Sequence, residues 1–275
     1  MFKDYKVIIK GGGDLATAVA HKLRRSGFPV IITEISQPKM VRRTVSFGNC
    51  IYEGTWTVEG ITAEYVESPE KIDEVIACEH IPLLIDPKCS ILKKIYPEIL
   101  IDGILAKRNI GTSINDAPIV IGLGPGFTAS KDVHAIIETK RGHTLGQVIF
   151  DGSSLPNTGI PGNIGGYTHE RVFRAPKAGL VKNCVDIGNM VKEGDILCFV
   201  DDVPVKAKIS GIVRGIIHDG LIVPHMEKLG DVDSRGQKEY CYTISDKGRT
   251  IAGGVLEAIL YLLDKSSRGE NCEAT

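Results

Sequence analysis

The chain has almost no net charge and lacks the cysteine spacings of metal or redox sites. Its formal net charge is −1 over 275 residues, so it has no field to attract nucleic acid or an anionic membrane. Seven cysteines are scattered along the chain without a CxxC, so neither a zinc knuckle nor a disulfide framework is indicated. Reduced thiols in a cytoplasmic protein are the expected state of such a set.

A long apolar segment is also lacking. The most apolar helical stretch, residues 254–263, is interrupted by Glu257 and is too short to span a bilayer. The first six residues are charged and lead directly into a strand, so no signal peptide is expected. With 43% hydrophobic and 24% charged residues, the composition is that of an ordinary globular protein with one large or two medium domains.

The most informative feature is a glycine-rich turn near the N-terminus. It belongs to a predicted unit of strand, glycine turn, helix, strand and acid, which is the βαβ arrangement that binds nucleotides. In order, these parts are residues 7–10, Gly11, Gly12 and Gly13, residues 15–25, residues 29–33, and Glu34.

Each residue type in this unit has a physical reason. Gly11 can take the positive φ of a tight turn, and Gly13 lets the backbone approach a pyrophosphate closely. The helix that begins near Leu15 offers unpaired N–H donors and the positive end of its dipole. Glu34 is placed to accept hydrogen bonds from ribose hydroxyls. Asp14 is expected to be the N-cap, although its charge would repel a phosphate on the turn.

Further strands that end in Asp or Gly predict a mostly parallel α/β sheet. In such sheets ligands bind at the carboxyl ends of the strands. A second glycine-rich turn, residues 122–128, lies at the end of the apolar stretch 117–123, and it is either a phosphate or carboxylate site or a sharp connection. Its glycines are Gly122, Gly124 and Gly126.

Two strands, residues 133–138 and 145–150, are expected to form a hairpin with Arg141 in its basic turn, either a solvated loop or an anion clamp. Metal coordination has no positive support in the sequence. The residues considered for it are Asp86, Asp102 and His134.

The chain is predicted to divide into a Rossmann-like domain over residues 1–150, a Gly/Pro-rich linker over 151–170, a β-rich module over 171–240, and a C-terminal helix and tail over 241–275. The β-rich module repeats a rhythm of short strands and turns that resembles the barrel-sandwich hybrid of biotinyl and lipoyl carriers. The carrier function is not expected, because Pro204 falls at the predicted turn and Lys206 already belongs to the next strand.

The last helix, over residues 249–265, is amphipathic and is expected to pack back on the core. Ser245 or Asp246 is its expected cap.

Taken together, these segments resemble the YqeB family of the selenium-dependent molybdenum hydroxylase system. The similarity covers nearly the whole chain. It is carried by residues 8–16, 42–47, 104–109, 122–128, 132–134, 138–143, 157–159 and 245–247. The resemblance implies a bacterial cytoplasmic protein that helps molybdenum hydroxylases to mature or handles their cofactor. In role and nucleotide-binding fold the family is similar to accessory proteins that deliver molybdenum cofactor to xanthine dehydrogenase.

The cofactor implied by this resemblance is molybdopterin cytosine dinucleotide, whose pyrophosphate the first glycine turn can hold. Basic residues are expected to neutralise its remaining charge, although exposed ones often only interact with solvent. These possible anion contacts are Arg42, Arg43, Lys107, Arg108 and Arg141. If selenium passes through the chain covalently, a thiol of depressed pKa is required, and Cys50 is the candidate.

Three functions therefore remain open. The first is a maturation factor that binds the molybdopterin dinucleotide and docks a hydroxylase or another maturation protein on the second module. The second is an NAD(P)-dependent oxidoreductase, for which Glu34 favours NAD. The third is a structural adaptor that binds no ligand. No catalytic residue can be assigned, and a homo-oligomer is possible in each case.

Overall fold

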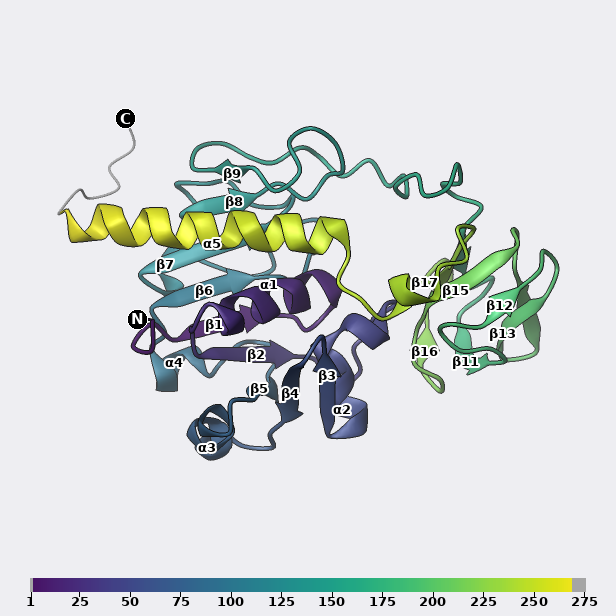
Figure 1. The fold of residues 1–275 in the computed structure, drawn as a ribbon, viewed down its shortest axis with the longest axis horizontal. Coiled ribbons are helices and arrows are strands. Elements are labelled where there is room, and N and C mark those ends of the chain that lie inside the picture. The colour runs from purple at the N-terminus through teal and green to yellow at the C-terminus, as the bar shows by residue number, and fades with distance from the viewer. Residues whose placement is uncertain (1, 269–275) are drawn as a thin grey trace.

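The computed structural model describes residues 2–268, in which a large, mostly parallel sheet lies beside a smaller β-rich module (Figure 1). The strands of the large sheet are, in chain order, β1 (Val7–Lys10), β2 (Val30–Glu34), β3 (Thr55–Val58), β4 (Ile61–Tyr65), β5 (Ile81–Ile85), β6 (Ile99–Asp102), β7 (Ile119–Leu123), β8 (Ala135–Ile137) and β9 (Val148–Ile149).

The spatial order of these strands is β3-β4-β5-β2-β1-β6-β7-β8-β9. The two edge pairs, β3–β4 and β8–β9, are antiparallel, and the pairs between them are parallel. The predicted mostly parallel sheet and the hairpin at its edge are confirmed. Because the chain runs from β1 to β2 on one side and later returns to β6 on the other, the strand order reverses at β1. Ligands bind at such reversals, beyond the carboxyl ends of the strands.

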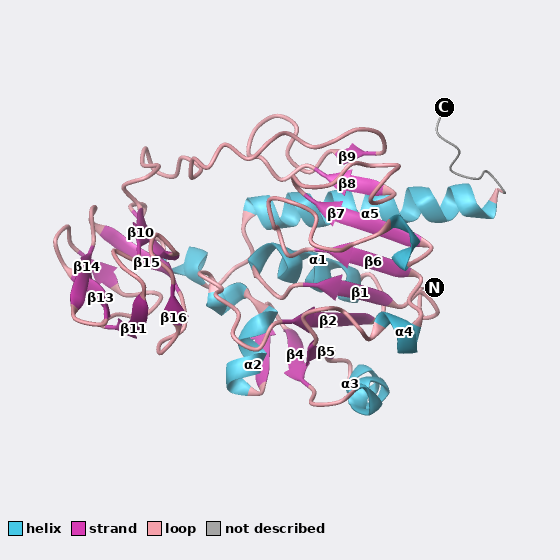
Figure 2. Ribbon diagram, turned by 180° about the vertical axis from the view of Figure 1, so that it is seen from behind, coloured by secondary structure: helices cyan, strands magenta, loops and turns pink. Residues whose placement is uncertain are grey.

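Both faces of the sheet are covered at its centre, so the central strands β1, β5, β6 and β7 are mostly apolar and buried. Side chains alternate along β1, where Val7 and Ile9 join one core and Ile8 joins the other. Helices α1 (Asp14–Arg25) and α5 (Asp246–Ser267) pack side by side on the first face (Figure 1). The second face carries α3 (Ile72–Ala77) and connecting segments (Figure 2). The remaining short helices are α2 (Cys50–Glu53) and α4 (Leu92–Ile95).

The second module contains two four-stranded antiparallel sheets around one apolar core. One has the order β10-β17-β15-β12, and the other has the order β14-β13-β11-β16. Their bounds are β10 (Val172–Arg174), β11 (Gly179–Asn183), β12 (Met190–Val191), β13 (Ile196–Val200), β14 (Val203–Lys206), β15 (Gly211–Ile216), β16 (Ile222–Val223) and β17 (Lys228–Asp233).

The turn between β13 and β14 differs from the prediction. Asp201 and Asp202 form the turn, and Pro204 lies within β14, opposite Phe199. Proline is tolerated there because β14 is an edge strand. Lys206 is the last residue of β14, as expected.

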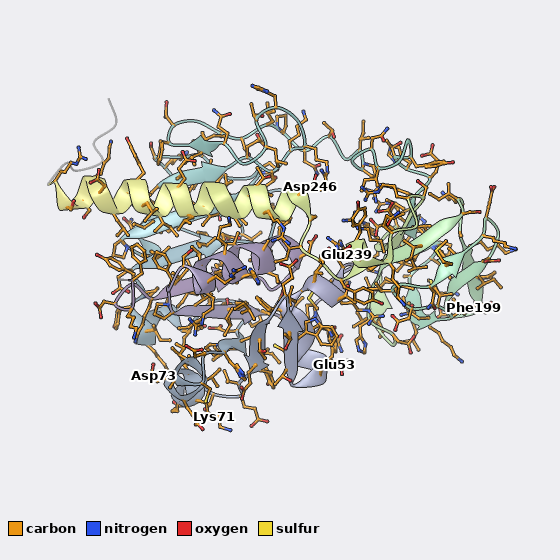
Figure 3. The ribbon with its side chains drawn as sticks, viewed as in Figure 1. Glu53, Lys71, Asp73, Phe199, Glu239 and Asp246 are labelled. Carbon is orange, nitrogen blue, oxygen red and sulfur yellow. The ribbon has the colours of Figure 1, made fainter. Side chains whose placement is uncertain are left out.

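The C-terminal helix α5 begins with the predicted serine cap. The Ser245 hydroxyl accepts a hydrogen bond from the Gly248 N–H at 3.1 Å. Asp246 is the first helical residue and lies at the end of α5 that faces the second module (Figure 3). None of the described helices has the length and apolarity needed to cross a membrane.

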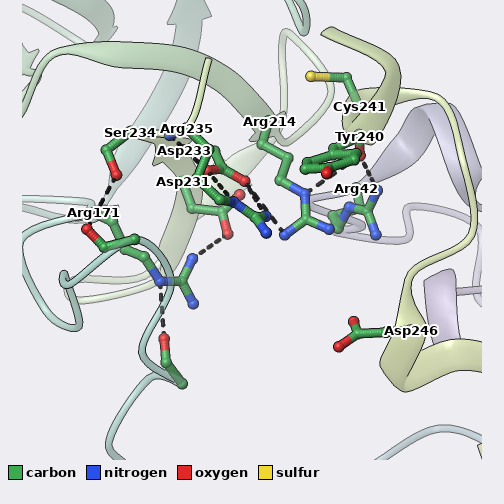
Figure 4. Close-up of polar contacts among 12 residues, drawn as sticks. Arg42, Arg171, Arg214, Asp231, Asp233, Ser234, Arg235, Tyr240, Cys241 and Asp246 are labelled. Carbon is green, nitrogen blue, oxygen red and sulfur yellow. Dashed lines mark hydrogen bonds and ion pairs between the residues drawn. The ribbon is translucent and has the colours of Figure 1, made fainter. Parts of the chain in front are cut away.

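The segment after β2 joins the two parts of the structure. The Arg42 guanidinium donates to the carbonyl oxygens of Tyr240 and Thr243 at 2.8 and 3.2 Å, close to the buried Arg214 (Figure 4). Arg43 donates to the Ile216 carbonyl oxygen at 2.9 Å. The division at residues 150, 170 and 240 remains a prediction.

Candidate functional site

The first glycine turn holds the loops after β1 and β6 close together. Gly11 has a φ of +95°, and a Cβ on it would lie 3.2 Å from the Gly103 carbonyl carbon. A Cβ on Gly103 would in turn lie 2.9 Å from the Ala16 Cβ, so both loops need small residues. Gly12 is also confined, because its Cβ would lie 2.8 Å from the Gly48 backbone nitrogen.

Gly13 differs from its neighbours in facing open space. It is the N-cap of α1, with φ −69° and ψ 176°, and no side chain caps the helix. A Cβ on Gly13 would meet no atom within 4 Å. The start of α1 therefore has no side-chain cap and open space beside Gly13, where an anion can approach the helix N-terminus.

The prediction that Asp14 is the N-cap is wrong. Asp14 is the first residue inside α1, and its carboxylate lies 3.9 Å from the Arg42 guanidinium. This ion pair offsets the charge that would repel a phosphate. Leu15 is buried in the core, so only its backbone is available to a ligand.

Glu34 does not stand free for ribose hydroxyls in this structure. Its carboxylate accepts hydrogen bonds from the Gly12 N–H at 2.9 Å and the Ile35 N–H at 2.6 Å. Burial raises the pKa of Glu34, and these two backbone donors oppose the rise. Glu34, the last residue of β2, thus holds the glycine turn in place by accepting the Gly12 N–H.

The three arginines proposed as anion contacts all lie near carboxylates, Arg42 at 3.9 Å from Asp14. Arg43 and Arg141 are paired with carboxylates, at 2.7 Å from Asp186 and 2.9 Å from Asp246. Arg42 is buried, and its Nε has no hydrogen-bond partner among the described residues. Of these three arginines, Arg42 is therefore the one with a buried donor that no described residue accepts.

Lys247 was missed by the sequence reasoning. It is half-buried at the start of α5, and burial lowers the pKa of its ammonium, while the nearby carboxylate of Asp14 raises it. A partly buried cation close to the first turn of α1 favours an anionic ligand. The sequence did contain one signal for Lys247, because residues 245–247 are among the segments that carry the family resemblance. That resemblance assigned no role to Lys247.

The glycines at the end of β7 and in the loop that follows it have different roles. Gly122 and Gly124 leave room for the ring of Phe127 and the hydroxyl of Thr139, so both serve packing. Gly126 lines a cavity of about 600 Å³ together with Lys107, residues 127–128, residues 153–154 and residues 156–159. The structure thus separates the predicted site residues into a group at α1 and a group at this cavity.

The surroundings of Cys50 do not suit selenium transfer, and those of Asp102 do not suit metal coordination. Cys50 is buried, and burial raises the pKa of its thiol to about 12, so it lacks the low pKa that selenium transfer requires. Asp102 accepts a hydrogen bond from Thr112 and pairs with Lys10 at 3.3 Å. No cluster of three potential metal ligands occurs within residues 2–268.

Sequence comparison identifies a relative that matches almost the whole chain. No protein-family model matches this chain. Over 257 residues it is 47% identical to the uncharacterized protein YqeB of Escherichia coli, an alignment that covers 94% of this chain. The chain belongs to the YqeB family. The chain spans about half (48%) of the length of this relative. The activity of the whole relative is therefore not assigned to the chain.

Solved structures resemble this YqeB-family chain only weakly. The ectoine utilization protein EutE (DoeB) of Ruegeria pomeroyi has a TM-score of 0.24 and 10% identity, and the match covers 84% of this chain and 86% of that one. A succinylglutamate desuccinylase/aspartoacylase of Rhodobacter sphaeroides has a TM-score of 0.25 and 15% identity, with coverages of 84% and 85%. At these TM-scores the likeness supports no conclusion about fold or function.

Proposed function

We propose that this chain is a bacterial, cytoplasmic accessory protein for the maturation of selenium-dependent molybdenum hydroxylases. It binds molybdopterin cytosine dinucleotide, or a similar dinucleotide, and hands it on without a chemical step of its own. The observation that carries the proposal is the uncapped start of α1, where Gly13 faces open space beside two buried or half-buried cations, Arg42 and Lys247.

A pyrophosphate fits the residues at this position. The first N–H groups of α1 and the positive end of its dipole stabilise negative charge. The unpartnered Arg42 Nε is a buried donor, which is costly unless a ligand or water accepts its hydrogen bond. Lys247 supplies further positive charge near Asp14. When bound, the molybdopterin ligand would supply the metal chemistry of the recipient enzyme.

The Glu34 contacts bear on the ribose of any dinucleotide and do not by themselves separate this ligand class from NAD(P). In a dinucleotide-binding dehydrogenase the acid after the second strand accepts from ribose hydroxyls. Here both oxygens of Glu34 already accept backbone N–H groups, from Gly12 and Ile35. An NAD(P)-dependent oxidoreductase and a ligand-free adaptor remain the alternatives that the experiment below separates.

We assign the second module to the barrel-sandwich hybrid type and give it a docking role. Two small antiparallel sheets share one core, and the turn between β13 and β14 carries two aspartates in place of a lysine. Its partner is a molybdenum hydroxylase or another maturation protein.

The test is a thermal-shift and calorimetric titration with NAD, NADP, CTP and molybdopterin cytosine dinucleotide. A ligand at about 100 times its Kd stabilises the folded state by about 2.7 kcal/mol. We expect the molybdopterin ligand to stabilise the wild type and to lose this effect in Gly13→Asp and Lys247→Gln. Lys131→Gln is the charge-matched control, since Lys131 is exposed on the loop after β7. Selective stabilisation by NAD would instead indicate an oxidoreductase, and no response to any ligand would favour the adaptor.

A further inference from the structure

A buried arginine of the second module lies at the junction with the large sheet. Arg214, in β15, is only 7% exposed. Its Nε donates to the Tyr240 carbonyl oxygen at 3.3 Å, and the same oxygen accepts a hydrogen bond from Arg42 at 2.8 Å. The two guanidinium groups therefore lie side by side (Figure 4). Burial lowers the pKa of Arg214, and the like charge of Arg42 lowers it further.

The neighbouring carboxylates leave the charge of Arg214 largely uncompensated. Asp233 lies 3.8 Å from the Arg214 Nη1, but this carboxylate already accepts hydrogen bonds from the Arg235 side chain at 2.9 and 2.6 Å. Asp246 is engaged in the same way by Arg141, at 2.9 and 3.2 Å. Each of these two aspartates thus has a closer arginine partner, and an excess of positive charge remains at the junction.

The unused nitrogens of the two arginines open to solvent. Within residues 2–268, neither Nη atom of Arg214 donates a hydrogen bond, and the Nη1 of Arg42 has only the 3.9 Å contact with Asp14. The Nε of Arg42 is enclosed, whereas these three Nη atoms are not. Two guanidinium groups that are nine-tenths buried therefore present free N–H donors to accessible space. Such an arrangement suits an oxyanion, which arginine binds through several parallel hydrogen bonds.

Arg42 connects this pair of arginines to the start of α1. Its Nη1 lies 3.9 Å from the carboxylate of Asp14, the first residue of α1. The start of α5 lies against the same helix, because a Cβ on Gly248 would be 2.9 Å from the Ala18 Cβ. Lys247, the residue before Gly248, is half-buried there. Cations from the large sheet, from α5 and from the second module therefore gather beside the uncapped end of α1.

We propose that Arg214 completes the anion site at the start of α1, so that both modules bind a ligand with two linked phosphate groups. One phosphate lies beside Gly13 and Lys247, and the second lies against the free Nη groups of Arg42 and Arg214. This inference rests on the proposed function, since it concerns the same site. It adds that the second module supplies a binding residue, so the bound ligand also holds the two modules together.

The experiment is calorimetric titration of the full chain with inorganic pyrophosphate and, separately, with orthophosphate. We expect the wild type to bind pyrophosphate more tightly, because only this probe reaches both positions. Arg214→Gln should weaken pyrophosphate binding roughly tenfold, as for a lost hydrogen bond between charged groups. It should leave the affinity for orthophosphate unchanged, since the start of α1 and Lys247 are intact. Arg25→Gln is the matched control, because Arg25 is exposed at the far end of α1.

A second measurement uses the wild type alone and does not depend on the folding of a variant. The guanidinium nitrogen signals of Arg214 and Arg25 are followed by NMR during the pyrophosphate titration. We expect the Arg214 signals to shift and to saturate with the Kd found by calorimetry. The Arg25 signals should stay in place.

Three results would overturn the inference. They are wild-type affinity for pyrophosphate in Arg214→Gln, an equal loss of affinity in Arg25→Gln, and Arg214 signals that do not move at saturation. Gly13→Asp distinguishes this failure from failure of the proposed function. If it abolishes the binding of both anions while Arg214→Gln has no effect, the site at α1 stands and the role of Arg214 is refuted. If neither anion binds the wild type, the inference is also refuted, and the titration with the molybdopterin ligand decides the proposed function separately.

Discussion

Replacing Gly13 by aspartate should stabilise the folded protein while blocking the proposed ligand. Gly13 has an extended backbone conformation with a negative φ, and an added Cβ would touch nothing within 4 Å. Relative to glycine, an aspartate N-cap contributes a few tenths of a kcal/mol. Aspartate also has fewer backbone conformations than glycine in the unfolded chain, and this lower entropy stabilises the folded state by about 0.4–1 kcal/mol. Repulsion from Asp14, the next residue, offsets part of this gain. We therefore expect a net stabilisation of about 0.5–1 kcal/mol.

The assay is chemical denaturation and thermal melting of the free protein, followed by melting with molybdopterin cytosine dinucleotide. The free variant should melt roughly 1–3 °C higher than the wild type. The ligand should no longer raise its melting temperature, because a carboxylate would occupy the anion position.

Gly12→Ala provides the contrasting control. Its Cβ would lie 2.8 Å from the Gly48 backbone nitrogen, so we expect a loss of about 1–3 kcal/mol from overpacking. The reasoning is refuted if Gly13→Asp is destabilised as much as Gly12→Ala, or if it keeps the full ligand response.

Three further predictions concern buried and paired groups. Cys50 should resist a thiol reagent at pH 8 in the folded protein and react after unfolding, because burial raises the pKa of its thiol to about 12. The exposed Cys78 should react at once, and mass spectrometry of the labelled peptides distinguishes the two cysteines. The hydrogen bond from Arg141 lowers the pKa of Asp246 from 3.8 to about 2, so the stability contributed by this pair is present above pH 4 and is lost as the pH falls from 4 to 2. Arg141→Ala should return the Asp246 pKa toward 3.8 in a carboxyl NMR titration, and an unchanged value would contradict the pairing. Arg42→Met should lower the free energy of unfolding, measured by urea denaturation, by about 2–4 kcal/mol, because two carbonyl oxygens lose a charged donor. A change below about 0.5 kcal/mol would show that the guanidinium does not join the two parts of the structure.

Local signals in the sequence predicted a large part of the fold. Apolar strands separated by a glycine turn and a helix implied the βαβ unit, since the period of apolar residues and the conformational freedom of glycine are properties of neighbouring residues. The positive φ of Gly11 and the Ser245 cap of α5 were predicted for the same reason. The hairpin of β8 and β9 was also predicted from the sequence, although its strands are shorter than expected.

The site required contacts between residues that are distant in the sequence. Nothing near Glu34 in the chain indicates that its carboxylate accepts the Gly12 N–H, because that bond forms only when β2 lies beside β1. The position of Lys247 near Asp14 depends on α5 packing against α1.

What the sequence determined by itself was the kind of each element and the family, because these depend on local residue order and on similarity along the chain. Only the tertiary structure decided which donors were left free. Gly13, not Asp14, is the open end of α1. The Oγ of Ser154 is buried without a hydrogen-bond partner within the described part of the chain. Whether a polar group is satisfied depends on every segment that packs around it, and that is a property of the fold.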